Sequence, residues 1–140
     1  RICAEQLVDE ARDTMGCVAT FIWVDEEQIE LLHVGDTRAY GIDGDAITQL
    51  TEDDRDRIGR VTNWVGNPRG ITVARRSLAP DDWDFLLLCS DGVPLELRDE
   101  RMLKIVREAG EPARVVQAML EAALGEQGRD NLSVVCVELY

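Results

Sequence analysis

The stretch "DDWDFLLLCSDGVPLE" (residues 81–96) contains an apolar run that ends in a carboxylate. Residues 85–89 are apolar or nearly so at every position, which is typical of a strand covered on both faces. Ser90, Asp91 and Gly92 follow directly. Asp-Gly is ordinary turn chemistry, so a turn is the simplest interpretation of Asp91. The alternative is that the fixed end of a buried strand positions the Asp91 carboxylate for chemistry.

Strand-like runs of the same kind recur along the chain. Asp43-Gly44-Asp45 separates two of them, and Asp-Gly between such runs predicts a hairpin. A second hairpin is expected around residues 25–27, and residues 71–78 have the character of an edge strand. We therefore predict strands at residues 17–24, 28–35, 37–42, 46–50, 71–78, 85–89 and 131–139. Residues 51–60 are polar and predict a loop or a short helix, and residues 61–70 predict irregular structure.

Three helices are expected from apolar residues at helical spacing. The first covers the opening segment and ends at Met15-Gly16. In the second, Asp99 is the expected N-cap and Gly110 ends the helix. The third begins with Pro112 in its first turn and ends before Gly125. The predicted buried stripes of the second and third helices are Met102, Leu103, Val106 and Ala109, and Val116, Met119, Leu120 and Ala123. Hairpin-linked strands with helices predict an α+β fold of helices packed on antiparallel sheets.

The composition fits one globular domain over residues 1–140, without repeats or linkers. With 15 basic and 28 acidic residues the net charge is −13, which argues against nucleic acid or an anionic membrane as partner. No apolar run approaches the roughly 20 residues of a membrane span, so no membrane insertion is expected. Four separated cysteines without a CxxC pair predict reduced thiols, and hence a cytoplasmic location.

Three carboxylates stand at boundaries of predicted strands: Asp36, Asp91 and Asp130. Mg²⁺ and Mn²⁺ prefer hard oxygen ligands, and rigid strand ends position such ligands well. If the strands are neighbours, the three side chains could converge on metal ions that activate water. Spacing alone does not show convergence, and an acidic chain places carboxylates in turns by chance.

Several other kinds of chemistry lack their sequence motifs in this chain. None of the cysteines has the Cys-x5-Arg spacing, and neither GxxxxGK[ST] nor GxGxxG occurs. The single histidine, His33, lies in the middle of a predicted strand, where a structural role in the core is expected.

Four segments together resemble the metal-dependent PP2C-type (PPM) Ser/Thr protein phosphatases. They are "LLHVGDTRAYGIDGDAITQLTEDD" (residues 31–54), "VTNWVGN" (61–67), "DFLLLCSDGVPLELRDE" (84–100) and "GRDNLSVVCVEL" (128–139). The resemblance implies a four-layer α-β-β-α sandwich with a binuclear Mg²⁺ or Mn²⁺ centre at one end of the sheets. Metal-activated water would hydrolyse phosphoserine and phosphothreonine in proteins. Asp91 and Asp130 match metal ligands of the family, and Asp36 matches a residue that helps hold a third metal in some members.

The sequence also departs from the family pattern. Nothing before Gly16 matches the early arginine or the Asp-Gly segment that supplies the bridging ligand, and the flap shrinks to about ten residues. Asn63 stands where the family has arginine. We therefore expect an N-terminally incomplete PP2C domain that lacks the first strands and most of the flap, and is weak or inactive alone. The complete protein is expected to be a bacterial-type phosphatase that acts on a phosphorylated protein and opposes a Ser/Thr kinase. No catalytic residue is separable from the metal ligands, and substrate-binding residues are not identified. The alternative is a PP2C-fold pseudophosphatase that serves as a protein-binding regulatory module.

Overall fold

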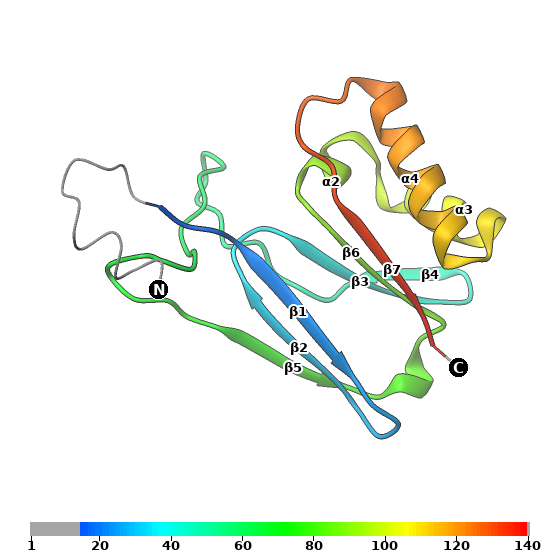
Figure 1. Ribbon diagram of the computed structural model, residues 1–140, viewed down its shortest axis with the longest axis horizontal. Coiled ribbons are helices and arrows are strands. Elements are labelled where there is room, and N and C mark those ends of the chain that lie inside the picture. The colour runs from blue at the N-terminus through cyan, green and yellow to red at the C-terminus, as the bar shows by residue number, and fades with distance from the viewer. Residues whose placement is uncertain (1–14, 140) are drawn as a thin grey trace.

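The computed structural model describes residues 15–139 and forms two antiparallel sheets that face each other (Figure 1). The three-stranded sheet has the order β1-β2-β5, and the four-stranded sheet has the order β4-β3-β6-β7. The strands are β1 (Ala19–Val24), β2 (Ile29–Val34), β3 (Arg38–Asp43), β4 (Ala46–Gln49), β5 (Ala74–Leu78), β6 (Phe85–Cys89) and β7 (Val134–Glu138). The α+β sandwich of antiparallel sheets is thereby confirmed.

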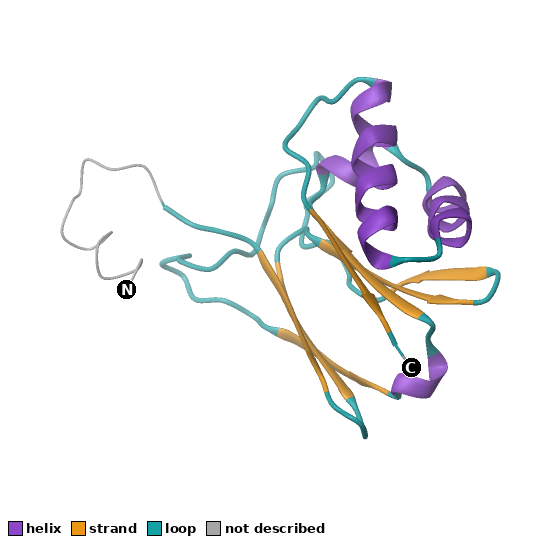
Figure 2. Ribbon diagram, turned by 45° about the vertical axis from the view of Figure 1, so that its right-hand side comes forward, coloured by secondary structure: helices purple, strands orange, loops and turns teal. Residues whose placement is uncertain are grey.

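Helices α3 (Asp99–Ala109) and α4 (Pro112–Glu126) cover the outer face of the four-stranded sheet (Figure 2). The short helix α2 (Gly92–Glu96) follows β6, and the 3₁₀ helix η1 (Pro80–Asp82) precedes it. Three of the four layers of the predicted sandwich therefore lie among residues 15–139. The helix predicted for the opening segment falls on residues 1–14, outside the described part of the chain.

The position of strand β6 between the other sheet and the helices explains why its sequence is apolar at every position. Leu86 faces the other sheet and belongs to a core cluster with Ile29 and Leu31. Its neighbour Leu87 faces the helices and belongs to a second cluster with Met102. Both leucines are fully buried. A strand in the middle of three layers has no solvent face, so the alternation of polar and apolar residues disappears.

Both predicted hairpins are confirmed: β1 pairs with β2, and β3 pairs with β4. Strand β5 is an edge strand as predicted, although it begins at Ala74 rather than at residue 71. Strand β7 begins at Val134 rather than at residue 131. The segment 51–60 forms no helix, and the two short helices α2 and η1 were not predicted. Such short elements carry too little periodicity to be recognised from sequence.

Two details of the helices differ from prediction. Asp99 is not the N-cap but lies in the first turn of α3, where its charge complements the helix dipole. In α4 the buried stripe is Val115, Met119 and Ala123, and the helix continues through Gly125 to Glu126. Pro112 in the first turn of α4 and Gly110 at the end of α3 are as predicted.

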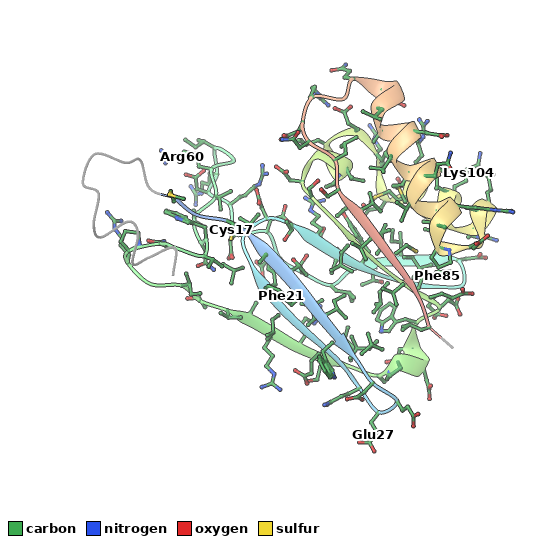
Figure 3. All side chains as sticks on the ribbon, in the orientation of Figure 1. Cys17, Phe21, Glu27, Arg60, Phe85 and Lys104 are labelled. Atoms are coloured by element: carbon green, nitrogen blue, oxygen red, sulfur yellow. The ribbon has the colours of Figure 1, made fainter. Side chains whose placement is uncertain are left out.

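The cysteines that the structure describes, Cys17, Cys89 and Cys136, are free. Burial raises the pKa of the Cys89 thiol to about 12 and that of the Cys136 thiol to about 11. Both are therefore poor nucleophiles, because the thiolate is the reactive form. Cys17 is exposed (Figure 3), and Cys3 lies outside the described residues. Within residues 15–139, no helix combines the length and the apolar character needed to cross a membrane.

Tyr40 on β3 is completely buried, and its hydroxyl accepts a hydrogen bond from Arg38 Nη1 at 3.2 Å. Burial raises its pKa to about 12. Above pH 10 the unfolded chain loses this proton while the folded protein keeps it, so stability present below pH 10 falls as the pH rises towards 12. We expect this tyrosine to account for a loss of about 2 kcal/mol in the free energy of unfolding. Urea unfolding at several alkaline pH values checks this. The decline should be less steep in Tyr40→Phe than in the wild type, and equal slopes would contradict it.

Candidate metal centre at the strand ends

Asp36 and Asp91 come together although they follow strands of different sheets, β2 and β6. Both carboxylates bind the guanidinium of Arg55. Arg55 Nε donates to Asp36 Oδ2 at 2.8 Å, and Arg55 Nη2 lies 2.5 Å from Asp36 Oδ2 and 2.5 Å from Asp91 Oδ2. Two of the three predicted site residues therefore converge on a single position that holds positive charge.

The three charged side chains differ in exposure. The Asp36 side chain is only 6% exposed, whereas those of Arg55 and Asp91 are 28% and 33% exposed. Burial works to lower the pKa of Arg55, but its hydrogen bonds to Asp36 and Asp91 raise the pKa above its ordinary value. Arg55 therefore carries a positive charge between the two carboxylates.

Asp130, the third predicted residue, belongs to a segment that packs against the start of α2. A Cβ atom at Gly92 would lie 2.5 Å from Asn131 O and 3.3 Å from Asp130 Cβ. Ser90 ties the two segments together, since its Oγ donates to Asn131 O and accepts from Ser133 N. Glycine after Asp91 therefore allows the segment that carries Asp130 to approach.

The donor chemistry of these residues fits a hard divalent cation, because carboxylate oxygens are preferred ligands and two of them already share one cation. Within residues 15–139, however, no three His, Cys, Asp or Glu side chains are grouped so that they could hold a metal ion. The carboxylate of Asp130 accepts the backbone N–H of Asn131 instead, at 2.7 Å.

A pocket of about 150 Å³ opens beside this cluster. On its wall Arg38 binds Asp53 through both Nε and Nη2, at 2.9 and 2.8 Å. This forked pairing fixes both side chains. The pocket is lined by Arg38, Asp53, Arg55, Asp91, Pro94 and Leu95. Arg55, Arg38 and Asp53 were not predicted as site residues, and the only sequence signal was the dense charge of residues 52–57.

The polar segment that carries Arg55 is held by Asp54 and Asn63. Asp54 Oδ2 accepts the N–H of Gly35 and the side-chain amide of Asn63, each at 2.8 Å. Asn63 also exchanges two hydrogen bonds with the backbone of Thr72. Asn63 thus fastens the polar segment beside Asp36.

His33 has the predicted structural role. It is 2% exposed, and its ring nitrogens pair with Thr20 Oγ1 at 2.9 Å and with Glu52 O at 3.1 Å. Both nitrogens are engaged with neutral partners inside the sandwich, so the ring braces β1 and β2 against the polar segment.

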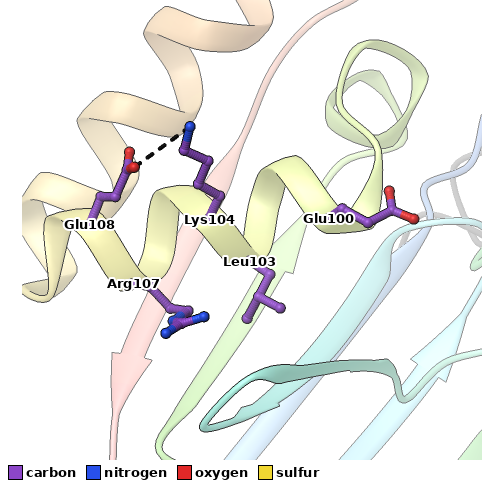
Figure 4. A pocket seen from close by; sticks show the side chains of 5 residues that line it. All are labelled: Glu100, Leu103, Lys104, Arg107 and Glu108. Carbon is purple, nitrogen blue, oxygen red and sulfur yellow. Dashed lines mark ion pairs between the residues drawn. The ribbon is translucent and has the colours of Figure 1, made fainter.

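A second pocket, of about 400 Å³, lies on the outer surface of α3 (Figure 4). Its lining residues are Glu100, Leu103, Lys104, Arg107 and Glu108. Lys104 pairs with Glu108 at 3.7 Å, and both side chains are 68% exposed. Such a solvated pair offers neither a nucleophile nor buried charge, so the strand ends remain the candidate site.

The family model for protein phosphatase 2C matches residues 2–133 of the chain. The chain belongs to the protein phosphatase 2C (PP2C) family. The Ser/Thr phosphatase PstP of Mycobacterium tuberculosis is 28% identical over 157 residues, which cover 99% of this chain and 30% of PstP. The Ser/Thr phosphatase stp of Listeria innocua is 26% identical, over 89% of this chain and 57% of that protein.

Solved structures agree with the PP2C assignment. The PstP catalytic domain in complex with two manganese ions superimposes with a TM-score of 0.78 at 27% identity, over 99% of this chain and 65% of that one. A bacterial serine phosphatase superimposes with a TM-score of 0.91 at 19% identity, which supports the fold alone. It too is covered only to 64%. The chain thus spans less than two thirds of these relatives.

Proposed function

We propose that the protein containing this chain is a metal-dependent phosphatase that hydrolyses phosphoserine and phosphothreonine in proteins. The observation that supports this most directly is the convergence of Asp36 and Asp91 on one cation position at the strand ends. The two manganese ions of the related PstP catalytic domain support divalent-metal dependence. A phosphorylated protein substrate, a cognate Ser/Thr kinase and a cytoplasmic location are parts of this proposal.

In the proposed site Asp91, Asp130 and Asp36 are the residues that would hold Mg²⁺ or Mn²⁺. When bound, such ions lower the pKa of water and stabilise charge on a phosphoryl group. The protein's own contribution is placement. Strand β6 fixes Asp91, Gly92 admits the segment of Asp130, and the Arg38–Asp53 pair lines the adjoining pocket.

A pseudophosphatase that binds protein partners is the second candidate. It is favoured by the position of Arg55, which places a protein cation between Asp36 and Asp91. It is also favoured by the absence, within residues 15–139, of a group of three metal-ligating side chains. For this reason residues 1–140 alone are proposed to be weak or inactive.

Hydrolysis of a phosphothreonine peptide by the full-length protein that contains these residues separates the two candidates. We expect phosphate release with Mn²⁺, loss of release when EDTA removes the metal, and recovery when excess Mn²⁺ is returned. A folded full-length protein that releases no phosphate with either Mn²⁺ or Mg²⁺ would contradict the proposed phosphatase activity. The pseudophosphatase that binds protein partners would then be the remaining candidate.

A further inference from the structure

Asp36 is a buried carboxylate whose hydrogen-bonding and ion-pairing partner, among the contacts within residues 15–139, is Arg55. A buried charge without a counter-charge is strongly unfavourable. A cation between Asp36 and Asp91 therefore stabilises the fold, and Arg55 supplies it.

The guanidinium takes up the carboxylate oxygens that face this position. Arg55 uses Nε and Nη2 on Asp36 Oδ2, and the same Nη2 reaches Asp91 Oδ2. A divalent ion bound to Asp91 and Asp36 would stand within a few ångströms of this positive charge, where like charges repel strongly in partly buried surroundings. Metal and guanidinium cannot both occupy the position.

The side chain also has room to leave. Arg55 is 28% exposed and borders the 150 Å³ pocket, and it is carried by a segment whose tip, around Arg60, projects from the sheets (Figure 3). The backbone at the root of this segment is held by Asp54, so the side chain can move while Gly35 and Asp36 stay in place.

We propose that Arg55 is an internal counter-cation that competes with divalent metal for Asp36 and Asp91. In the absence of metal it stabilises the two carboxylates, and metal binding requires that it swing out of the site. The competition sets the metal concentration at which the centre fills. This inference rests on the metal site of the proposed function, but not on hydrolysis.

The test is isothermal titration of the full-length protein with Mn²⁺ alone, comparing the wild type with Arg55→Gln and Arg60→Gln. Arg60→Gln is the matched control, because it removes the same charge from the same segment and breaks a pair with Asp56, outside the cluster. We expect Arg55→Gln to bind Mn²⁺ at least about tenfold more tightly than the wild type. Arg60→Gln should remain within about twofold of the wild type.

Thermal unfolding gives an independent readout. Without metal, Arg55→Gln should melt about 5 °C below the wild type, because Asp36 is left uncompensated. Saturating Mn²⁺ should abolish that deficit, which a purely structural role for Arg55 would not allow. Arg55→Lys keeps the charge but not the forked geometry of the guanidinium. It replaces Arg55→Gln as the test variant if Arg55→Gln does not fold. It should bind Mn²⁺ about threefold more tightly than the wild type.

Equal Mn²⁺ affinity in the wild type, Arg55→Gln and Arg55→Lys would overturn the competition, as would a melting deficit that Mn²⁺ leaves unchanged. Failure of every variant to bind Mn²⁺ would also overturn the proposed competition. Phosphopeptide hydrolysis by the full-length protein tests the proposed phosphatase activity separately. Tighter binding in Arg55→Gln without any hydrolysis in the full-length protein would support the competition and contradict the enzyme.

Discussion

Asp91→Ala should lower the Mn²⁺-dependent turnover of a phosphothreonine peptide by the full-length protein at least about 100-fold. The reason lies in the position of Asp91 at the end of β6, where its carboxylate shares one cation position with Asp36. Loss of one oxygen ligand removes both charge and geometry from a metal site. The decisive quantity is kcat at saturating Mn²⁺, measured on protein whose melting temperature shows that it is folded.

Asp45→Ala is the matched control for this substitution. It removes one carboxylate from the same four-stranded sheet, at the exposed β3–β4 turn, where Asp45 forms a surface pair with Arg107. Turnover should be unchanged in this control. Wild-type turnover in Asp91→Ala would show that the site has been assigned to the wrong residues.

Gly92→Ala should damage the same site through packing. The added Cβ would lie 2.5 Å from the backbone oxygen of Asn131 and 3.1 Å from Leu132 Cδ2, so the segment that carries these residues would have to shift. We expect the free energy of unfolding to fall by about 2 kcal/mol, as is usual when a packed interior receives an extra methyl group. Because the displaced segment carries Asp130, the affinity of the chain for Mn²⁺ should fall as well. Urea unfolding and Mn²⁺ titration measure the two effects.

Gly125→Ala is the matched control for Gly92→Ala. Gly125 lies in α4, and a Cβ there would meet no atom within 4 Å. Alanine in a helix is favoured over glycine by about 0.5–1 kcal/mol, so this variant should be more stable than the wild type, with unchanged Mn²⁺ affinity. Equal stability of Gly92→Ala and the wild type would mean that the Asp130 segment does not depend on a close approach at Gly92.

The features that the sequence predicted well are local ones. The apolar run of residues 85–89 predicted a strand covered on both faces, and Asp43-Gly44 predicted a hairpin, because strand burial and turn conformation depend on adjacent residues. Met119 and Ala123 of the predicted α4 stripe are buried, but the first turn of the helix buries Val115 rather than Val116, and both of these valines are apolar. Only the packing of α4 on the sheet decides which of them is buried.

The candidate site was predictable in part, for a similar reason. Strand-end position singled out Asp36 and Asp91, but their meeting depends on how two sheets stack, which spacing along the chain does not contain. Arg55 was not predicted as a site residue. The sequence around an arginine in a polar segment does not show whether its side chain forms a partly buried ion pair or is solvated. Its role became visible only through its distances to two residues that are far apart in sequence.

The two sheets are interleaved along the chain, and this governs how the protein folds. The three-stranded sheet contains β1, β2 and β5. Strands β3 and β4, which belong to the other sheet, lie between β2 and β5 in the sequence. The four-stranded sheet is likewise incomplete until β7, the last of the described strands, pairs with β6. No single cut therefore separates the sheets into independent halves. Pairings of such long range are slow to form, so we expect folding to be slow and to proceed as one cooperative transition.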